Sequence, residues 1–419
     1  MYLLAFLIKM RIIIIKEEKE AKDMINEKMY ALGSKRSSIR EIFEYAKSRA
    51  AQIGAENVFD FSIGNPSVPA PEAVNETIEK LVKETSSVAL HGYTSAQGGK
   101  DVRDTIAANY QKRFGVALSG DDLYMTCGAA ASLTITLHAL HEEGDEIIVF
   151  APYFAEYKVF VEGSGAKLVV LPSDEKTMLP NFEALRRAIN PNTKAVLINS
   201  PNNPSGVVYG EETMQTLCTI LSEKAQEFHK RIFLISDEPY RELVYDKKTV
   251  VPSPMRYYAD SIVCYSYSKS LSLPGERIGY IAVNPRMENA KEVYAAVCGA
   301  GRLLGFVCAP ALFQRVAAAC DGMTADLSIY KRNRDLLYNA LTSYGFTCIY
   351  PDGAFYLFMK AAEKDAKAFC ERAKKYELLF VAGDDFGYPG WVRIAYCVQT
   401  EQIQRALPLF EKLAKEYAL

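Results

Sequence analysis

Histidine is scarce in this chain, and the cysteines show none of the spacings typical of zinc ligands. Only four histidines occur among 419 residues, which gives little support to a catalytic triad built on imidazole. The nine cysteines form no CxxC pair, so we expect neither a disulfide framework nor structural zinc. The sequence therefore predicts no metal site and a reducing compartment, the cytoplasm.

An excess of charge of one sign is also missing. The 49 basic and 51 acidic residues leave a net charge of −2, which argues against nucleic acid or an anionic membrane as the main partner. The chain is 49% hydrophobic and 24% charged, as is typical of a soluble globular protein of two or three lobes. No internal repeat or low-complexity linker interrupts it.

Long hydrophobic runs are absent as well. Two apolar patches near the N-terminus are broken by Lys9 and Arg11, and neither reaches the roughly 18 residues that a membrane span needs. The order of charge and apolar residues does not match a signal peptide. We expect no stable membrane insertion and interpret residues 1–28 as a leader, with Met24 or Met29 as the true start. A membrane-touching anchor is the alternative.

Four apolar, strand-like runs are present, and each ends on polar or small residues. The residues at these ends are Gly128, Ala129 and Ala130, then Asn203, Pro204 and Gly206, then Asp237 and Tyr240, and finally Lys269. In an open α/β sheet the ligand lies beyond the carboxyl ends of the strands. We therefore expect these four ends to converge on one crevice.

Helical patterns alternate with the apolar runs. They cover Pro71–Glu84, Lys100–Phe114, Ala130–Glu142, Asn181–Ile189 and Glu211–Lys230. This alternation predicts an α/β fold whose large domain has a mainly parallel sheet covered by helices on both faces. After about Gly305 the pattern changes to a long helix, a hairpin-like segment, another helix, a strand and a terminal helix, which predicts a smaller α/β domain. We expect an N-terminal segment at 29–64 that packs with the small domain, a large domain at 65–304 and the small domain at 305–419.

Lys269 lies in the segment Ser266-Tyr267-Ser268-Lys269-Ser270. Its amine could hold an aldehyde covalently only in the neutral form, and the usual lysine pKa is about 10.4. Lys269 would therefore have to be desolvated or lie beside positive charge. A lysine between serines is also common on solvated loops, but the apolar run from Ser261 to Tyr267 favours the end of a buried strand.

The order of the motifs resembles the class I/II aminotransferases, which are pyridoxal-phosphate enzymes of fold-type I. The resemblance runs from about Ile39 to the C-terminus. Its seven motifs are Ile63-Gly64-Asn65-Pro66, Pro152-Tyr153-Phe154, Asn203-Pro204-Ser205-Gly206, Asp237-Glu238-Pro239-Tyr240, Ser266-Tyr267-Ser268-Lys269, Arg277 and Arg393. It implies pyridoxal 5'-phosphate as the cofactor, held as an aldimine by Lys269.

The resemblance gives the cofactor ring four further contacts. Asp237 would pair with the ring nitrogen and raise the pKa of that nitrogen, which strengthens the ring as an electron sink. Tyr240 and Asn203 would donate hydrogen bonds to the phenolic oxygen. Phe154 would stack on the ring, with Tyr153 as the alternative. Ordinary roles as turn, capping or core residues remain open for all of them.

The phosphate group needs hydrogen-bond donors at a strand-to-helix junction. The resemblance supplies Gly128, Ala129, Ala130, Ser266, Ser268 and Arg277 for this purpose. Small residues at such a junction could also mean only close packing. Tyr93 would reach the phosphate from a neighbouring subunit, which implies a homodimer with shared active sites.

Arg393 would bind the substrate α-carboxylate as a bidentate partner, with Asn203 and the backbone of Gly64 close by. A dicarboxylate substrate needs a further cation. Arg302 and Arg36 are candidates, and either could be a surface arginine. One bacterial branch of aspartate-using enzymes looks to carry a lysine at the position of Ala130. This sequence therefore lacks that determinant of aspartate specificity.

The sequence thus predicts ping-pong transamination between an L-amino acid and a 2-oxo acid, with aspartate and 2-oxoglutarate as the favoured pair. Alanine or aromatic amino acids remain open. A carbon–sulfur β-lyase is an alternative because the fold alone does not separate the two reactions. A non-enzymatic sensor is disfavoured, since no segment the size of a helix-turn-helix module precedes the body.

Overall fold

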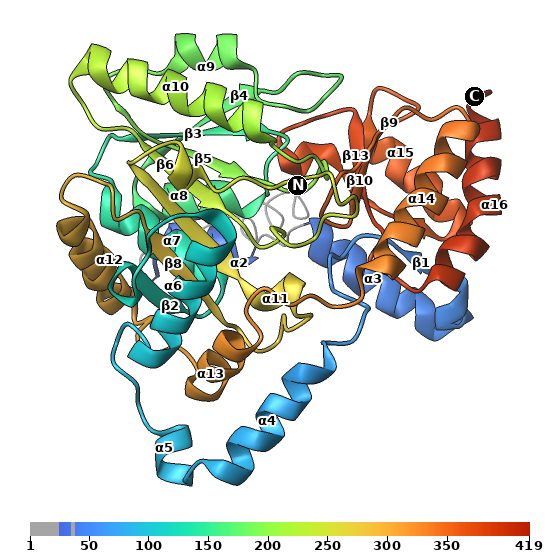
Figure 1. The fold of residues 1–419 in the computed structure, drawn as a ribbon. Helices are drawn as coiled ribbons and strands as arrows, with labels where there is room; N and C mark the ends of the chain where they lie inside the picture. The colour runs from blue at the N-terminus through green and yellow to red at the C-terminus, as the bar shows by residue number, and fades with distance from the viewer. Residues whose placement is uncertain (1–24, 35–37) are drawn as a thin grey trace, which may run out of the picture.

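The computed structural model describes residues 25–34 and 38–419. Most of the predicted leader and the candidate Arg36 lie outside this range. The described chain forms a large lobe around one sheet and a smaller lobe around another (Figure 1). Its N-terminal helices are α2 (Glu27–Ser34) and α3 (Ser38–Ile53).

The large lobe is built on a seven-stranded sheet with the order β2-β8-β7-β6-β5-β3-β4. These strands are β2 (Leu123–Thr126), β3 (Glu146–Ala151), β4 (Lys167–Pro172), β5 (Thr193–Asn199), β6 (Phe233–Asp237), β7 (Ser261–Ser266) and β8 (Gly279–Val283). Among the described strands of this sheet, β8 alone runs opposite to the rest, because it pairs antiparallel with β2 and β7. The pairs from β4 to β7 are parallel. The sheet is therefore mainly parallel, as predicted.

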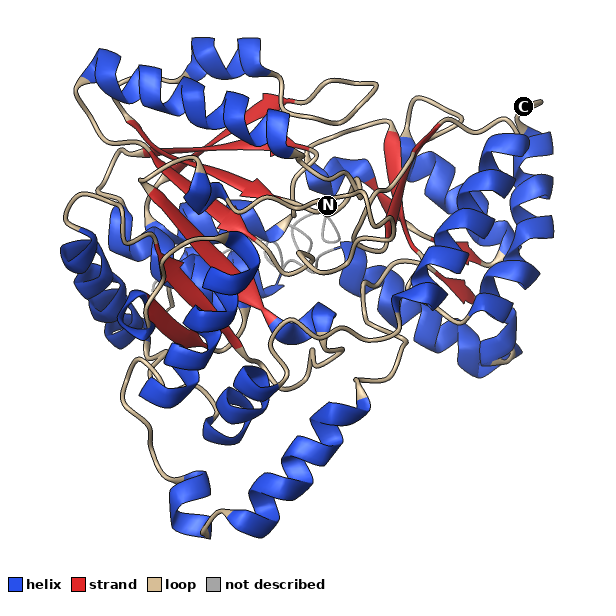
Figure 2. Ribbon diagram, in the orientation of Figure 1, coloured by secondary structure: helices blue, strands red, loops and turns tan. Residues whose placement is uncertain are grey.

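Helices cover both faces of this sheet (Figure 2). The helices of the large lobe are α4 (Glu72–Glu84), α5 (Ser87–His91), α6 (Lys100–Phe114), α7 (Ala129–Leu140), α8 (Glu156–Ser164), α9 (Phe182–Ala188), α10 (Glu211–Phe228), α11 (Tyr267–Ser270), α12 (Ala290–Leu304) and α13 (Ala311–Ala319). Of these, α4 and α5 extend away from the sheet (Figure 1), and α11 follows the end of β7. Alternate residues of a strand point to opposite faces. Ile147 and Val149 accordingly pack with α7, α8 and α12, whereas Ile148 and Phe150 pack with α9 and α10.

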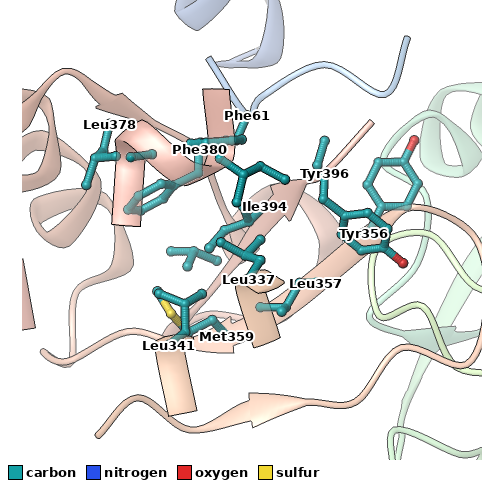
Figure 3. Packing of buried hydrophobic residues seen from close by; sticks show 14 of the residues in the cluster. Phe61, Leu337, Leu341, Tyr356, Leu357, Met359, Leu378, Phe380, Ile394 and Tyr396 are labelled. Carbon is teal, nitrogen blue, oxygen red and sulfur yellow. The ribbon is translucent and has the colours of Figure 1, made fainter. Parts of the chain in front are cut away.

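The small lobe contains an antiparallel sheet of four strands in the order β12-β13-β10-β9. Its strands are β9 (Cys348–Ile349), β10 (Tyr356–Lys360), β12 (Val381–Ala382) and β13 (Trp391–Ala395), and its helices are α14 (Leu327–Ser343), α15 (Ala366–Ala373) and α16 (Thr400–Glu416). Figure 3 shows Leu337 and Leu341 of α14 packed with Leu357, Met359 and Ile394 of the sheet.

Both ends of the chain build the small lobe. β1 (Phe59–Asp60) pairs in parallel with β11 (Leu378–Leu379), and the backbone N–H of Ala395 donates to the carbonyl of Phe61 at 2.8 Å. Phe61 is itself part of the core in Figure 3. The predicted fold class is confirmed, and the exact residue limits of the domains stay predictions.

Three of the predicted helices end earlier than the sequence indicated, of which α9 ends only one residue early, at Ala188. α7 stops at Leu140 and α10 at Phe228, two residues before the predicted limits in each case. His229 adopts a left-handed conformation with φ of 49° and ends α10, whereas His141 is extended. Within the described residues, no helix combines the length and apolar character that a bilayer crossing requires.

Candidate functional site

A cavity of about 310 Å³ lies between the carboxyl ends of the large sheet and the small lobe. Its wall includes residues that follow β2, β5, β6 and β7, together with β10 and β13 of the small sheet. The lining residues are Ile39, Ile63, Gly64, Ala129, Ala130, Leu133, Phe154, Phe160, Asn199, Asn203, Asp237, Pro239, Tyr240, Ser266, Ser268, Lys269, Pro274, Arg277, Tyr356 and Arg393. The four strand ends that we expected to converge therefore do so.

Lys269 projects into this cavity from α11, the short helix that follows β7. Ser266 caps α11 by accepting a hydrogen bond from the Ser268 N–H at 3.1 Å. The Lys269 Nζ donates to the carbonyl of Gly64 at 2.6 Å. Burial lowers the pKa of Lys269 to about 8, and the positive charges of Arg393 and Arg277 act in the same direction. The amine thus meets the requirement for a nucleophile near neutral pH.

Asp237, the last residue of β6, presents one unpartnered oxygen. Its Oδ2 accepts a hydrogen bond from the Tyr157 hydroxyl at 2.6 Å, while its buried Oδ1 has no partner among the described residues. Burial raises the pKa of Asp237 to about 7, and the Tyr157 hydrogen bond opposes the rise. A buried carboxylate oxygen without a donor is costly. A protonated ring nitrogen would supply that donor, so Asp237 fits the pyridine end of the expected cofactor.

The N-terminus of α7 forms another part of the cavity wall, where Ala129 and Ala130 lie. Gly128 precedes the helix with φ of 89°, and a Cβ added there would lie 2.7 Å from Arg277 Nη2. The Arg277 Nη1 donates to the Ser268 Oγ at 3.3 Å, and the Ser266 Oγ donates to the same oxygen at 2.7 Å. Helix N–H groups, hydroxyls and a guanidinium together suit a phosphate dianion.

Phe154, and not Tyr153, lines the cavity. The Phe154 ring meets the Tyr157 ring edge to face, with centroids 5.6 Å apart. The Tyr153 backbone N–H donates to the Phe386 carbonyl at 3.0 Å, and its ring packs so tightly on Gly387 that a Cβ there would lie 2.6 Å from Tyr153 Cε1. Of the two aromatics that the sequence left open, Phe154 is the one that faces the cavity, and its stacking on the cofactor stays a prediction.

Arg393 and Tyr356 bring the small sheet to the site. The Arg393 Nη1 donates to Asn203 Oδ1 at 3.1 Å, and its Nη2 donates to the carbonyl of Ser62. The Arg393 Nε is buried without a partner, and no carboxylate among the described residues forms an ion pair with it. The hydroxyls of Tyr240 and Tyr356 lie 2.9 Å apart. A buried, unpaired guanidinium at a cavity wall is suited to a substrate carboxylate.

Gly64 passes between the two lobes where a side chain would not fit. A Cβ at this position would lie 1.9 Å from the Tyr356 Oη. The absence of a side chain allows the Gly64 carbonyl to reach the Lys269 amine. Gly64 therefore lies at the predicted place.

Three predicted site residues do not line the cavity of their own chain. They are Gly128, which directly precedes the lining residues Ala129 and Ala130, and the two residues Tyr93 and Arg302. Tyr93 is 98% exposed, and Arg302 is exposed near the end of α12. Their roles in a second subunit stay predictions. The described residues also contain no group of three or more His, Cys, Asp or Glu side chains that could hold a metal ion.

Sequence reasoning missed several functional neighbours. Asn199 ends β5, donates to the Asp237 carbonyl at 2.9 Å and accepts from the Asn203 N–H at 2.7 Å, so the rule of strand ends could have found it. Tyr157 lies in the first turn of α8, and its backbone N–H donates to the Phe154 carbonyl at 2.9 Å; no pattern in the sequence singled it out. Tyr356 carried no comparable signal. The apolar lining residues that were missed are Ile39, Ile63, Leu133 and Phe160.

Known proteins share this arrangement over nearly the whole chain. An amino transferase structure from Eubacterium rectale is 56% identical, has a TM-score of 0.92, and covers 94% of this chain and 100% of its own. An aspartate aminotransferase of Thermotoga maritima is 30% identical over 87% of this chain and 94% of its own length. Aromatic-amino-acid aminotransferase 2 of Thermococcus litoralis is 28% identical over 91% of this chain and 97% of its own.

A family model agrees with these similarities. The model described as "Aminotransferase class I and II" matches residues 56–409, a range that includes every cavity-lining residue except Ile39. The matched range also includes Lys269, Asp237 and the N-terminus of α7. The chain therefore belongs to the class I and II aminotransferases.

Proposed function

We propose that this aminotransferase uses pyridoxal 5'-phosphate, as its family implies, to exchange the amino group of L-aspartate with 2-oxoglutarate by ping-pong kinetics. The observation that carries the proposal is the pairing of Lys269 and Asp237 in one cavity. A buried amine with a lowered pKa and a buried carboxylate oxygen without a donor are the two groups that the cofactor requires at its aldehyde and its ring nitrogen.

The cofactor supplies an aldehyde that reacts with amines and a ring that withdraws electrons from the amino acid. Arg277, Ser266, Ser268 and the N-terminus of α7 would hold the phosphate. Asp237 would hold the ring nitrogen, and Phe154 would pack on the ring and exclude water. Tyr240 and Asn203 would donate hydrogen bonds to the phenolic oxygen.

Lys269 is proposed to act as both base and acid. As a free amine, its Nζ would take the proton from the substrate Cα as a general base and would then donate it as a general acid. A pKa of about 8 for Lys269 suits this exchange, because both protonation states are accessible near neutral pH. Arg393 would orient the substrate through its α-carboxylate, and the Gly64 carbonyl would hold the amine when it is not engaged.

The choice of aspartate is supported by the printed name of the Thermotoga maritima relative. Among the described residues that line the cavity, the cations are Lys269, Arg277 and Arg393, and each already has a role. The side-chain carboxylate would therefore need Arg302 of a second copy of the chain, or Arg36. This requirement and the exposed ring of Tyr93 lead us to propose a homodimer with shared active sites.

Aromatic amino acids are the second candidate substrates. The apolar residues Ile39, Leu133 and Phe160 line the cavity close to Phe154, which provides a surface for an aromatic side chain. The Thermococcus litoralis relative carries an aromatic-amino-acid name.

For the location of the protein in the cell we propose the cytoplasm. The nine cysteines of the described chain are all free, as is typical of a reducing compartment.

The test mixes cofactor-loaded enzyme with one amino acid at a time and follows loss of its visible absorption in a stopped-flow instrument. We expect aspartate to react fastest among aspartate, glutamate, alanine and phenylalanine, and 2-oxoglutarate to restore the absorption. Fastest reaction with phenylalanine would replace aspartate by the aromatic candidate. Release of pyruvate and ammonia from cystathionine, with no need for an oxo acid, would instead support the β-lyase.

A further inference from the structure

A buried charge cluster of Glu238, Arg241 and Glu242 lies outside the cavity lining. The Arg241 Nη1 donates to Glu238 Oε2 at 3.1 Å, and its Nε donates to Glu242 Oε1 at 3.1 Å. The three residues are only 2%, 4% and 8% exposed, respectively. One guanidinium thus bridges two carboxylates inside the protein, and nothing in the proposed chemistry uses it.

One arm of the cluster leads to Asp237. Glu238 is the next residue in the chain, and its backbone N–H donates to the Cys264 carbonyl at 2.8 Å. Its Oε1 accepts a hydrogen bond from the Ser236 Oγ at 2.8 Å. The side chain of Glu238 therefore fixes the backbone on which the Asp237 carboxylate is mounted.

The other arm leads to Lys269. Glu242 Oε2 accepts a hydrogen bond from the Tyr265 hydroxyl at 2.7 Å, and the Tyr265 and Ser270 hydroxyls lie 3.0 Å apart. Ser270 is the neighbour of Lys269 in α11. A continuous path of hydrogen bonds therefore runs from Arg241 to the helix that carries the reactive amine.

We propose that Arg241 is a positioning residue that sets the distance between the Asp237 carboxylate and the Lys269 amine by bridging Glu238 and Glu242. The proposal rests on the function proposed above, because only a cofactor bound at both of its ends requires this distance to be fixed. Arg241 itself does not line the cavity.

Stability alone is a weak reason to bury such charges. Apolar replacements of buried ion pairs are often neutral or stabilising, because desolvation offsets the attraction. The fork of an arginine, however, can hold two carboxylates in fixed directions, which a lysine cannot do. The Arg241 guanidinium also lies 4.1 Å from the centroid of the Tyr265 ring and donates to the Tyr280 hydroxyl at 3.1 Å, so its own orientation is fixed.

Three variants separate the two arms. Arg241→Lys keeps the charge but loses the fork, Ser236→Ala weakens only the arm to Asp237, and Tyr265→Phe weakens only the arm to Lys269. The matched control is Arg334→Lys, because Arg334 is also 4% exposed. It donates to Asp335 at 2.8 Å and to the Pro351 carbonyl at 3.2 Å in the small lobe, and does not line the cavity.

The first measurement is amide hydrogen exchange on the protein without cofactor. We expect Arg241→Lys to speed exchange in two segments, which are β6 with the residues that follow it, and α11. Ser236→Ala should speed exchange only in β6 and the residues that follow it, and Tyr265→Phe should do so only in α11. Arg334→Lys should change neither segment. This readout does not depend on any activity, so it remains decisive if the wild-type protein fails to transaminate, which would contradict the proposed function alone.

The second measurement is the rate of the first half-reaction in fully loaded enzyme at saturating amino acid. Displacing catalytic groups by about 1 Å can cost up to a hundredfold, so we expect a ten- to hundredfold loss for Arg241→Lys and smaller losses for the single-arm variants. Equal melting temperatures for Arg241→Lys and Arg334→Lys, with unchanged exchange and rate in both, would overturn the proposal. If Arg241→Lys does not fold, unchanged exchange in both single-arm variants would overturn it instead.

Discussion

The two sheets contribute to the cavity in different ways. The parallel sheet supplies groups at the point where its strands end, such as Asp237 at the end of β6 and Lys269 just after β7. The antiparallel sheet supplies Arg393 from the middle of β13, where the residue pairs with Phe358 and Val381. Asp237 and Lys269 thus lie at or just beyond the ends of strands, whereas Arg393 lies within a strand that is paired on both sides.

This difference predicts that the large lobe governs the chemical step and that the small sheet governs recognition of the substrate. Connections at the carboxyl ends of parallel strands can converge on one ligand, since all of these strands point the same way. A residue in the middle of a paired strand is held by hydrogen bonds on both sides and has less freedom. We therefore expect changes in the large lobe to affect the chemical step, and changes in the small sheet to affect substrate binding.

The largest effect should come from Lys269→Ala. Loss of the amine removes both the covalent tether and the proton carrier, and general acid–base catalysis alone contributes up to about 10⁴-fold. We expect turnover to fall by about 10⁴-fold or more while cofactor is still retained. Steady-state assays and borohydride reduction of the wild-type protein, followed by peptide mapping, check this. Near-normal transamination by the variant, or a label on another residue, would refute the assignment.

Arg393→Lys should have a smaller effect of a different kind. A charge-assisted hydrogen bond is worth about 1.5–3 kcal/mol, so KM for amino acids should rise by about ten- to a hundredfold, with a smaller change in kcat. Arg277→Lys is the matched variant in the large lobe, and it should weaken cofactor binding and leave KM less affected. If Arg393→Lys lowered kcat as strongly as the loss of Lys269, the proposed separation between the two sheets would be wrong.

The smallest effect concerns stability and pH. Because the pKa of Lys269 is lowered from 10.5 to about 8, the folded protein without cofactor binds fewer protons than the unfolded chain between these values. Its stability should therefore rise with pH across this window. Lys269→Met lacks this pH dependence, so it should be more stable than wild type at pH 7 by roughly 3 kcal/mol, and the difference should close towards pH 10.5.

Denaturant titrations of both proteins without cofactor, at several pH values, measure this difference. Asp237, whose pKa is raised to about 7 by burial, is present in both proteins, so its own pH dependence largely cancels in the comparison. A constant difference between pH 7 and pH 10.5 would show that the Lys269 amine is not desolvated.

The sequence predicted the parts of the site that lie at strand ends. Asp237, Asn203 and Lys269 each follow an apolar run, and the direction of a parallel strand is enough to bring such ends together. The choice between Phe154 and Tyr153 was beyond the sequence, since neighbouring residues in an irregular segment differ only in which way they turn. Tyr356 was missed because its role depends on how the small lobe docks against Gly64.

The buried cluster was also beyond sequence reasoning. In the sequence the cluster is an ordinary charged stretch that follows a strand, made of Glu238, Arg241 and Glu242. Charged residues in such a stretch usually face solvent. Only the packing of Tyr265 and Tyr280 against Arg241 shows that they are inside. Pattern reasoning therefore finds groups that touch a ligand more readily than groups that hold them in place.

The pairing of β1 with β11 has a consequence for how the protein is made on the ribosome. The first strand emerges early in translation, but its partner emerges only when most of the polypeptide has been synthesised. Until β11 has been synthesised, β1 has no strand to pair with, and contacts between such distant parts of a chain also form slowly. The strand that bears Arg393 follows later still, so a newly made molecule should gain its complete substrate-binding wall as one of its last steps.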